Sequence, residues 1–364
     1  MNVCVVGGIF DKDAAYRRIH QQTPETILVD GLRSRGIAVR SSGHLDFVPR
    51  AGEIVHVHHI GRAAVSAAGA RHIAGLAVTP HDGRLISGGT HHPLSRRLAW
   101  RFAASWADAI VALSAREAHA FGRVADHARI VVIPNGIPYV PAEDATAAPP
   151  PYLLYVGQLI PLKGVADLLA AFARLAPTVA EMQLWLAYHN AQDEAVLKAE
   201  AQRQGIEERV RFLGAQNQAA LRVLYRDAVC TVLPSYAEAL PSALIEAQLQ
   251  GCPVVATDVG DTASIVGDPT RLVKPGDVEG LARVLGTMLA DHASRHPEAR
   301  TARRDRMREQ FGVARMIDAH VALYTRLADM RQHRVGRTLI DLGARVVLPV
   351  KSAGLHTLDA ADPA

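Results

Sequence analysis

Short apolar runs rich in β-branched residues alternate with amphipathic helical stretches along the whole chain. The runs are continuously apolar, which is typical of strands that are buried on both faces of a sheet. This alternation predicts an α/β fold in which helices cover both faces of parallel sheets. The expected strands are Val3–Val6, Ile54–His58, Ala77–Thr79, Ala109–Ala112, Ile130–Ile133, Tyr152–Val156, Gln183–Leu186, Val210–Phe212, Cys230–Leu233, Pro253–Ala256 and Arg271–Val273.

A change of composition near the middle of the chain marks the expected boundary between two domains. Val140–Pro151 is rich in Pro, Ala and acidic residues, and a new expected strand follows it. A chain of 364 residues suits two domains of roughly 150–180 residues each. We predict one lobe over residues 1–148, a second over 149–325, and a crossover helix and tail over 326–364. Two doubly wound lobes of this kind face each other across a cleft and bind ligands at the carboxyl ends of their strands.

The composition restricts the class of protein. No segment offers the ~20 consecutive apolar residues that a membrane-spanning helix needs, and the apolar start of the chain is too short for a signal peptide. Cys4, Cys230 and Cys252 lack the spacing of a metal site or a disulfide framework, which favours a reducing cytoplasm. The net charge of +4 is mild and Arg is spread along the chain, so nucleic acid is not an expected partner.

The most informative local feature is a pair of glutamates, Glu238 and Glu246, on either side of a Pro-Ser turn. The second glutamate lies inside the helix that this turn is expected to open. The first turn of a helix has unpaired backbone N–H groups and a partial positive charge, which suit a phosphate. Carboxylates beside it can accept hydrogen bonds from sugar hydroxyls. The combination indicates a nucleotide-sugar site.

A second strand-to-helix turn, Gly157–Gly164, contains Lys163 and precedes the expected helix Val165–Leu175. An ammonium group beside a helix N-terminus is well placed for a diphosphate, because both act on the same anion. By itself the lysine is equally well explained as a solvated side chain next to a capping glycine. The other phosphate-competent turn in this half, Leu240–Ala243, favours the diphosphate interpretation.

The order and spacing of these segments resemble the retaining GT-B glycosyltransferases of family 4, over most of the chain. The two-glutamate segment is the most specific part of the resemblance. The other matching segments are Gly7-Gly8, Val55–His58, Thr79-Pro80-His81-Asp82, Ala107–Ser114, Ile133-Pro134-Asn135-Gly136, Val156–Gly164, Arg211–Gly214 and Gly251–Thr257.

The resemblance implies two Rossmann-like lobes and a cytoplasmic, metal-independent hexosyltransferase of polysaccharide or glycoconjugate biosynthesis. It would need no cofactor, use a nucleotide-diphosphate sugar as donor, retain the anomeric configuration, and act on a glycan, lipid-linked or small-molecule acceptor. The implied catalytic residues are His81, near the reacting carbon, and Glu238, on the sugar hydroxyls. The implied donor-binding residues are Gly8, Gln158, Lys163, Leu240, Pro241, Ser242 and Glu246, of which Lys163 neutralises the diphosphate and Glu246 holds the ribose.

Three departures from the family pattern affect this site. Gln158 stands where the family usually has Arg, which removes one cation from the diphosphate site. Ala239-Leu240 replaces the usual Gly-Phe after the first glutamate. The turn Leu186–Asn190 replaces a Gly-rich turn that often borders the nucleotide base.

Other polar groups have less specific interpretations. His56, His58 and His59 suit a cleft wall or a core better than zinc, because no further ligand is evident nearby. The acidic pair Asp11 and Asp13 resembles the metal motif of a different glycosyltransferase fold, and we attribute that to chance.

Two basic segments have two interpretations each. His91, Arg96 and Arg97 follow His81 and suit an anionic acceptor such as a lipid-linked phosphate, or simply a solvated helix start. The basic and apolar tail Arg331–Lys351 either packs on the first lobe or makes a peripheral contact with the inner face of a membrane.

Three other functions remain open at this stage. A sugar-nucleotide epimerase shares the two-lobed fold but needs no acceptor. A binding protein without turnover is compatible with the departures at Gln158 and Ala239. A nicotinamide-dependent dehydrogenase is disfavoured, because Val6-Gly7-Gly8-Ile9-Phe10 lacks the third glycine of the dinucleotide fingerprint.

Overall fold

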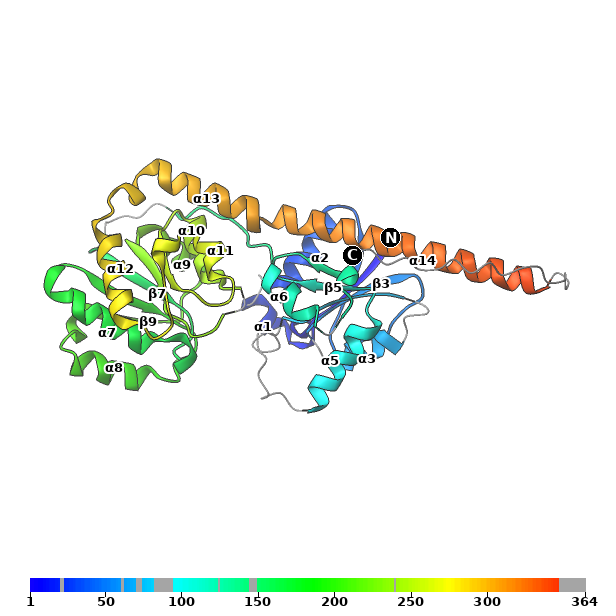
Figure 1. Cartoon of the computed structure of the whole chain (residues 1–364), viewed down its shortest axis with the longest axis horizontal. Coiled ribbons are helices and arrows are strands. Elements are labelled where there is room, and N and C mark those ends of the chain that lie inside the picture. Colours follow the sequence, from blue (N-terminus) through cyan, green and yellow to red (C-terminus); the bar gives the residue numbers. More distant parts are fainter. Residues whose placement is uncertain are drawn as a thin grey trace, which may run out of the picture.

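The chain forms two lobes, each built on a parallel six-stranded sheet (Figure 1). The strand orders are β2-β1-β3-β4-β5-β6 and β12-β11-β10-β7-β8-β9, and each order reverses around a central strand. The two doubly wound lobes confirm the expected fold class. The computed structural model describes residues 1–19, 23–59, 62–69, 74–81, 94–123, 125–143, 149–238 and 240–346.

All five strands expected in the first half are present, together with one that was not expected. The additional strand lies at the edge of the sheet, where its Ala-Val-Arg-Ser-Ser sequence is only partly buried and therefore lacks a continuous apolar run. The strands are β1 (Asn2–Val6), β2 (Ala38–Ser42), β3 (Glu53–His58), β4 (Gly75–Thr79), β5 (Ala109–Ala112) and β6 (Ile130–Val132).

Helices cover both faces of the first sheet, because successive apolar side chains of β1 point to opposite faces. Cys4 and Val6 belong to one apolar core, and Val3 and Val5 belong to another on the opposite face. The first core includes residues of α3 (Arg62–Gly69), α5 (Leu94–Trp106) and α6 (Ala115–Phe121), and the second includes residues of α2 (Pro24–Ser34) and α14 (Val313–Val346). The remaining short segments are η1 (Gly8–Asp11), α1 (Ala14–Ile19) and η2 (His127–Arg129).

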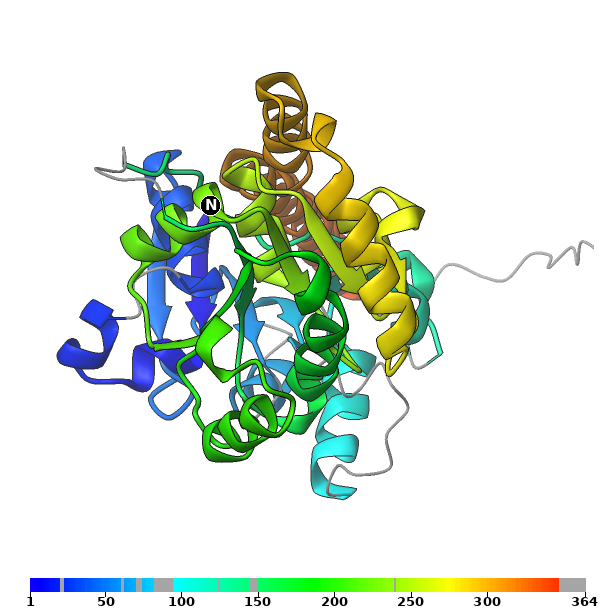
Figure 2. The same cartoon turned by 90° about the vertical axis from the view of Figure 1, so that its left-hand side faces the viewer.

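The second lobe has one large apolar core, and Figure 2 shows its helices on both sides of the strands. Its strands are β7 (Tyr152–Val156), β8 (Gln183–Ala187), β9 (Val210–Gly214), β10 (Cys230–Leu233), β11 (Val254–Thr257) and β12 (Leu272–Val273). Its helices are α7 (Val165–Leu175), α8 (Glu194–Arg203), α9 (Gln218–Asp227), α10 (Ser242–Leu249), α11 (Thr262–Val266), α12 (Val278–Ala290) and α13 (Pro297–Phe311). Five 3-10 segments complete it: η3 (Pro161–Lys163), η4 (Ala176–Thr178), η5 (Glu207–Arg209), η6 (Pro269–Arg271) and η7 (Ala293–Arg295).

Two segments cross between the lobes side by side. The amide of Ile137 donates to the carbonyl of Phe311 at 2.8 Å. A Cβ on Gly136 would lie 2.8 Å from Cα of Val313, so this close approach requires glycine. From there α14 runs along the first lobe and packs on α2, β3 and β4 (Figure 1). The side chains of the basic tail beyond Met330 lie outside the described part of the structure.

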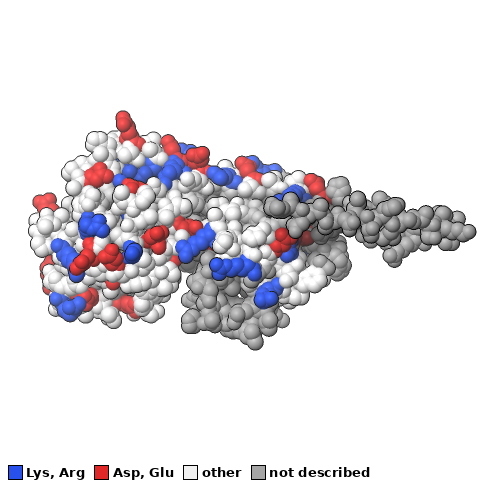
Figure 3. Space-filling model, viewed as in Figure 1, with Lys and Arg blue, Asp and Glu red and all other residues white. Residues whose placement is uncertain are grey.

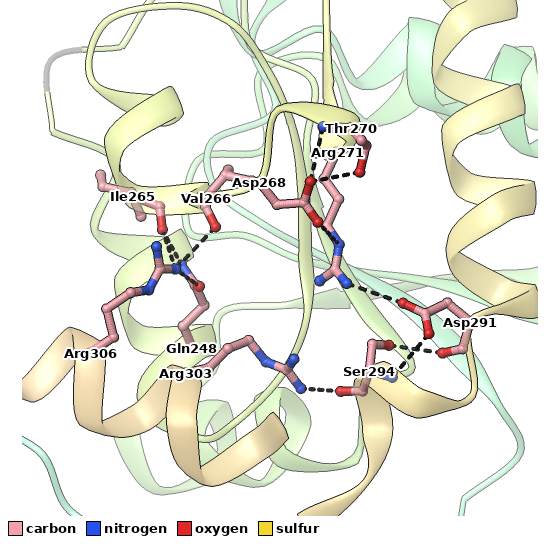
Figure 4. A network of polar contacts seen from close by, with 10 residues as sticks. All are labelled: Gln248, Ile265, Val266, Asp268, Thr270, Arg271, Asp291, Ser294, Arg303 and Arg306. Carbon is pink, nitrogen blue, oxygen red and sulfur yellow. Dashed lines mark hydrogen bonds and ion pairs between the residues drawn. The ribbon is translucent and has the colours of Figure 1, made fainter. Parts of the chain in front are cut away.

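Arginines of α13 bind the carboxyl ends of α10 and α11, and Figure 4 shows the part of this network around Arg306, Gln248, Ile265 and Val266. Arg306 donates to the carbonyls of Ile265 and Val266 at 2.8 and 3.0 Å, and Arg303 donates to that of Gly251 at 3.0 Å. The last carbonyls of a helix have no partner within the helix and carry partial negative charge, so cationic donors satisfy both needs. Helix α10 is therefore held from its last turn, while its first turn faces the candidate site.

Candidate functional site

The predicted site residues of the second lobe come from the loop after β7 and from the loop and helix α10 that follow the adjacent strand β10. Gly164 has a left-handed backbone with φ of 64°, and a Cβ there would lie 2.2 Å from the carbonyl oxygen of Pro234. The amide of Tyr236 donates to the carbonyl of Leu162 at 2.9 Å. Only glycine fits at this crossing, which brings the turn Gly157–Gly164 into contact with the loop that follows β10.

Lys163 and Glu238 form an ion pair where these two turns meet. Nζ of Lys163 lies 2.6 Å from Oε1 of Glu238, which also accepts a hydrogen bond from the hydroxyl of Ser235 at 2.6 Å. Both charged side chains are largely covered, with exposed fractions of 20% and 10%. The cation and the first carboxylate predicted from the sequence are thus held together as one unit.

Glu246 lies on α10 and lines a cavity of about 280 Å³ with Leu240 and Ser242. Desolvation raises the pKa of Glu246 to about 7, although hydrogen bonds from Tyr225 and Ser242 act in the opposite direction. The Tyr225 hydroxyl is 3.3 Å away. The cavity reaches across the lobes, because its other walls include Pro24 and Ile27 of α2, Asn135–Pro138, Val140, Gln218, Arg222, Leu249 and Gln250.

The first turn of α10 begins after Pro241, which provides no side-chain acceptor to cap the helix. Backbone N–H groups at such a helix start remain available to an anion. The loop after β7 lies in the neighbouring position, where Nε2 of Gln158 is 3.4 Å from Nε2 of His189. His189 follows β8 and was not predicted as a site residue. Its only signal in the sequence was its place in the turn that replaces the family's Gly-rich turn.

On the first lobe, the candidate residue His81 follows β4 with a left-handed backbone, φ of 50°. His59, at the end of the neighbouring strand β3, has a similar backbone with φ of 65°. Nε2 of His81 lies 2.8 Å from Nδ1 of His58. A left-handed backbone is uncommon for residues other than glycine, so the ends of these adjacent strands are locally strained.

The electrostatics of this end of the first lobe keep His81 neutral. Desolvation, followed by the nearby His58 and His59, holds the pKa of His81 well below its ordinary value. Glu25 behaves in the opposite way. Burial alone would raise its pKa, but hydrogen bonds, first of all from His59, lower it to about 2. Glu25 also fills the space beside Gly7, where a Cβ would lie 2.6 Å from its Cγ.

Gly8 opens η1, and the acidic pair that follows has local partners. Asp11 accepts hydrogen bonds from the amides of His44 and Leu45 at 2.9 and 3.2 Å. Asp13 accepts one from the amide of Tyr16 at 2.7 Å. Both carboxylates thus bind backbone amides of neighbouring segments. Within the described residues, no group of three or more His, Cys, Asp or Glu side chains is arranged to hold a metal.

Several candidate residues cannot be placed. Asp82, His91 and Ala239 lie outside the described residues. Arg96 and Arg97 are on α5, but their side chains are not described. Figure 3 shows acidic and basic side chains intermixed over the face drawn, without a broad patch of one sign. None of the described helices is both long enough and apolar enough to cross a membrane.

Comparisons with known proteins identify relatives of both lobes. Residues 141–308 match the family model of glycosyl transferases group 1, and residues 12–139 match the model of glycosyltransferase family 4. The chain is 32% identical over 241 residues to a D-inositol 3-phosphate glycosyltransferase of Nocardia farcinica, covering 60% of this chain and 53% of that one. It is also 32% identical over 162 residues to the O-antigen chain mannosyltransferase B of Escherichia coli, covering 44% and 42%. The chain thus spans about half the length of these relatives.

Solved structures show the same fold at low sequence identity. A sucrose-phosphate synthase from Thermosynechococcus elongatus has a TM-score of 0.73 at 20% identity, covering 90% of this chain and 98% of that one. Anabaena HepE in complex with UDP has a TM-score of 0.70 at 19% identity, covering 89% and 100%. Together the two family models match both lobes, and the fold is that of GT-B enzymes. The chain therefore belongs to the group 1, family 4 glycosyltransferases, a family of retaining enzymes that use nucleotide-sugar donors.

Proposed function

We propose that this protein transfers a hexosyl unit from a nucleotide-diphosphate sugar to an acceptor, with retention of the anomeric configuration. The donor binds to the second lobe, and the acceptor approaches from the first. The observation on which this proposal chiefly rests is the Lys163–Glu238 ion pair, beside a helix start without a side-chain cap and one turn away from Glu246.

In the proposed site the Lys163–Glu238 ion pair separates when the donor binds, and each side chain takes a new partner. In the free protein Glu238 neutralises Lys163 at 2.6 Å. A diphosphate would take over the ammonium group, and the freed carboxylate would then accept hydrogen bonds from the sugar. Departure of the nucleoside diphosphate develops negative charge, and a fixed cation with backbone N–H groups lowers that barrier. Hydrogen bonds involving a charged group are roughly twice as strong as neutral ones.

Glu246 suits the two hydroxyls of a ribose. Its carboxylate is partly desolvated, and among the described residues its side-chain partners are the hydroxyls of Tyr225 and Ser242. A desolvated carboxylate gains from additional hydroxyl donors, which stabilise its ionised form. The cavity beside it is walled by both lobes, so a ligand there also favours a closed arrangement.

The first lobe contributes His81 and the loop after Gly8, both facing the reacting sugar in this proposal. In this proposal the proton of the acceptor passes to the leaving phosphate in a front-face displacement. His91, Arg96 and Arg97 are proposed to guide an anionic acceptor. The names of the relatives, an inositol-phosphate glycosyltransferase and an O-antigen mannosyltransferase, support glycoconjugate or polysaccharide synthesis as the context.

A thermal-shift screen of UDP-, GDP- and ADP-sugars tests donor binding, because a ligand of the folded state raises the unfolding temperature by mass action. UDP is the first probe, since similar folds have been solved with UDP. The variants Lys163→Met and Glu246→Gln are expected to lose the shift, and Lys163→Met to lower kcat/KM by about 10- to 100-fold. Lys198→Met is the matched control, because that lysine pairs with Glu194 on the exposed surface of α8.

Incubation with donor alone separates transfer from isomerisation. We expect no new sugar nucleotide in the absence of an acceptor, whereas an epimerase would form one. Normal donor binding by both Lys163→Met and Glu246→Gln would contradict the proposed site. Tight donor binding without any transfer to the acceptors tested would favour a binding protein over an enzyme.

A further inference from the structure

A row of five histidine rings leads from the inside of the first lobe to His81. His320 on α14 lies 5.4 Å from His56, centroid to centroid, and His56 lies 4.5 Å from His58. His58 is 5.0 Å from His81, which in turn is 4.9 Å from His59. His56 and His58 are both buried on the face of β3 that α14 covers.

The inner rings of this row are fixed by hydrogen bonds. His56 contacts two hydroxyls, that of Tyr324 at 2.6 Å through Nδ1 and that of Thr79 at 2.7 Å through Nε2. Nδ1 of His320 lies 2.8 Å from the carbonyl oxygen of Met316. A carbonyl can only accept, so His320 has its proton on Nδ1. These contacts leave His56 and His320 no freedom to turn.

His58 has one buried nitrogen without a hydrogen-bond partner among the described residues. Nδ1 lies 2.8 Å from Nε2 of His81, while Nε2 is buried and contacts no hydrogen-bonding atom of the described residues. A proton on Nε2 would be a buried donor without an acceptor, which is unfavourable because the desolvation of the N–H is not offset. An unsatisfied acceptor is tolerated more often than an unsatisfied N–H. The proton of His58 therefore belongs on Nδ1, where it is donated to His81.

We infer that His58 is a positioning residue that fixes His81 as the Nδ1–H tautomer, so that His81 offers a neutral hydrogen-bond donor to an oxygen of the bound sugar or acceptor. With Nε2 occupied as the acceptor from His58, the ring of His81 has its own proton on Nδ1. Within the described residues this nitrogen has no partner, and His81 keeps part of its surface open.

Two further observations agree with this assignment. The rings of His58 and His81 are stacked with an interplanar angle of 21°, and His81 has a left-handed backbone that is strained for a residue other than glycine. Desolvation lowers the pKa values of His58 and His81 well below the ordinary value, so both rings are neutral and each has a single proton to place. The role of His81 as a hydrogen-bond donor to the substrate rests on the proposed transferase function, whereas its tautomer does not.

The tautomer is measurable by ¹⁵N NMR of the histidine rings in the full-length protein. In the wild type we expect His81 to show a protonated Nδ1 and an unprotonated Nε2. His58→Asn retains an amide donor near the position of Nδ1 and is expected to preserve this pattern. His58→Leu has a similar size but no donor, and is expected to release Nε2 of His81 to take the proton. Tyr324→Phe removes only a partner of His56 and is the control without effect on His81.

Kinetics provide the second measurement. His58→Leu is expected to lower kcat about 10- to 100-fold with little change in the KM for donor, and His58→Asn to recover most of that loss. A wild-type His81 protonated on Nε2, or an equal loss in both variants, would overturn the inference, and the first result does not require any variant to fold. The expected tautomer in a protein without transfer activity would instead count against the proposed function.

Discussion

At the residue scale, Glu246 combines a proposed binding role with a cost in stability. Its pKa is about 7 in the folded protein against 4.5 for the ordinary side chain, chiefly because of desolvation. The folded state therefore binds this proton more tightly than the unfolded chain does. The corresponding contribution to stability is fully present below pH 4.5 and is lost as the pH rises to about 7.

We predict that Glu246→Gln raises the free energy of unfolding by about 1–3 kcal/mol at pH 8, because it removes a desolvated charge. The gain should shrink at pH 5, where most of the wild-type carboxyl is already protonated. Urea denaturation at the two pH values measures the difference. Glu238→Gln is the control, since it leaves the ammonium of Lys163 without its partner and should bring no gain at pH 8. An equal effect of Glu246→Gln at both pH values would contradict the assigned pKa.

The sequence identified many of these side chains but not how they contact each other. Lys163 and Glu238 were predicted separately from two strand-to-helix turns. Their ion pair depends on β7 and β10 being neighbours, although β8 and β9 lie between them in the sequence. The His58–His81 contact was not predictable, because it depends on a left-handed backbone that no local pattern around His81 signals.

At the element scale, the turn before α7 depends on a single glycine. Gly164 is the cap residue between η3 and α7, and any side chain there would collide with the backbone of Pro234. The expected limits of this helix, Val165–Leu175, match the structure because the glycine and the apolar periodicity agree. β2 was not predicted, because an edge strand that is only partly buried has no continuous apolar run in the sequence.

We predict that Gly164→Ala both destabilises the second lobe and abolishes donor binding, because the turn bearing Lys163 must move away from Glu238. Gly205→Ala is the matched control. Gly205 has a similar φ of 67°, but a Cβ there would meet nothing within 4 Å. Gly205→Ala should lower the free energy of unfolding only by the cost of a left-handed backbone, about 1–2 kcal/mol. It should keep the thermal shift on donor binding. Equal losses in the two variants would show that backbone strain, and not the contact with Pro234, determines the outcome.

At the scale of the whole molecule, α14 connects the two lobes structurally. It follows α13 of the second lobe directly, and its residues Met316, Ile317, Leu323, Tyr324 and Leu327 complete an apolar core of the first lobe. The same helix supplies His320 and Tyr324 to the histidine row. A second contact joins the lobes at the guanidinium of Arg116, which donates to the carbonyl of Gly260 at 3.1 Å. The C-terminal part of the chain thus contributes to the stability of the N-terminal lobe.

Ile317→Ala tests this arrangement. Ile317 is 2% exposed and packs against Gly31 of α2, where a Cβ would lie 2.3 Å from its Cδ1. Truncating a buried isoleucine costs about 2–5 kcal/mol, and we expect the loss to fall on the first lobe, because Ile317 is absent from the core of the second. Hydrogen exchange measured by mass spectrometry should rise in β1 and α2 while β7 and β10 stay protected. The exposed Arg326 on the same helix gives the control Arg326→Ala, which should change neither. Exchange that rises equally in β7 and β10 would show instead that the two lobes unfold as one cooperative unit.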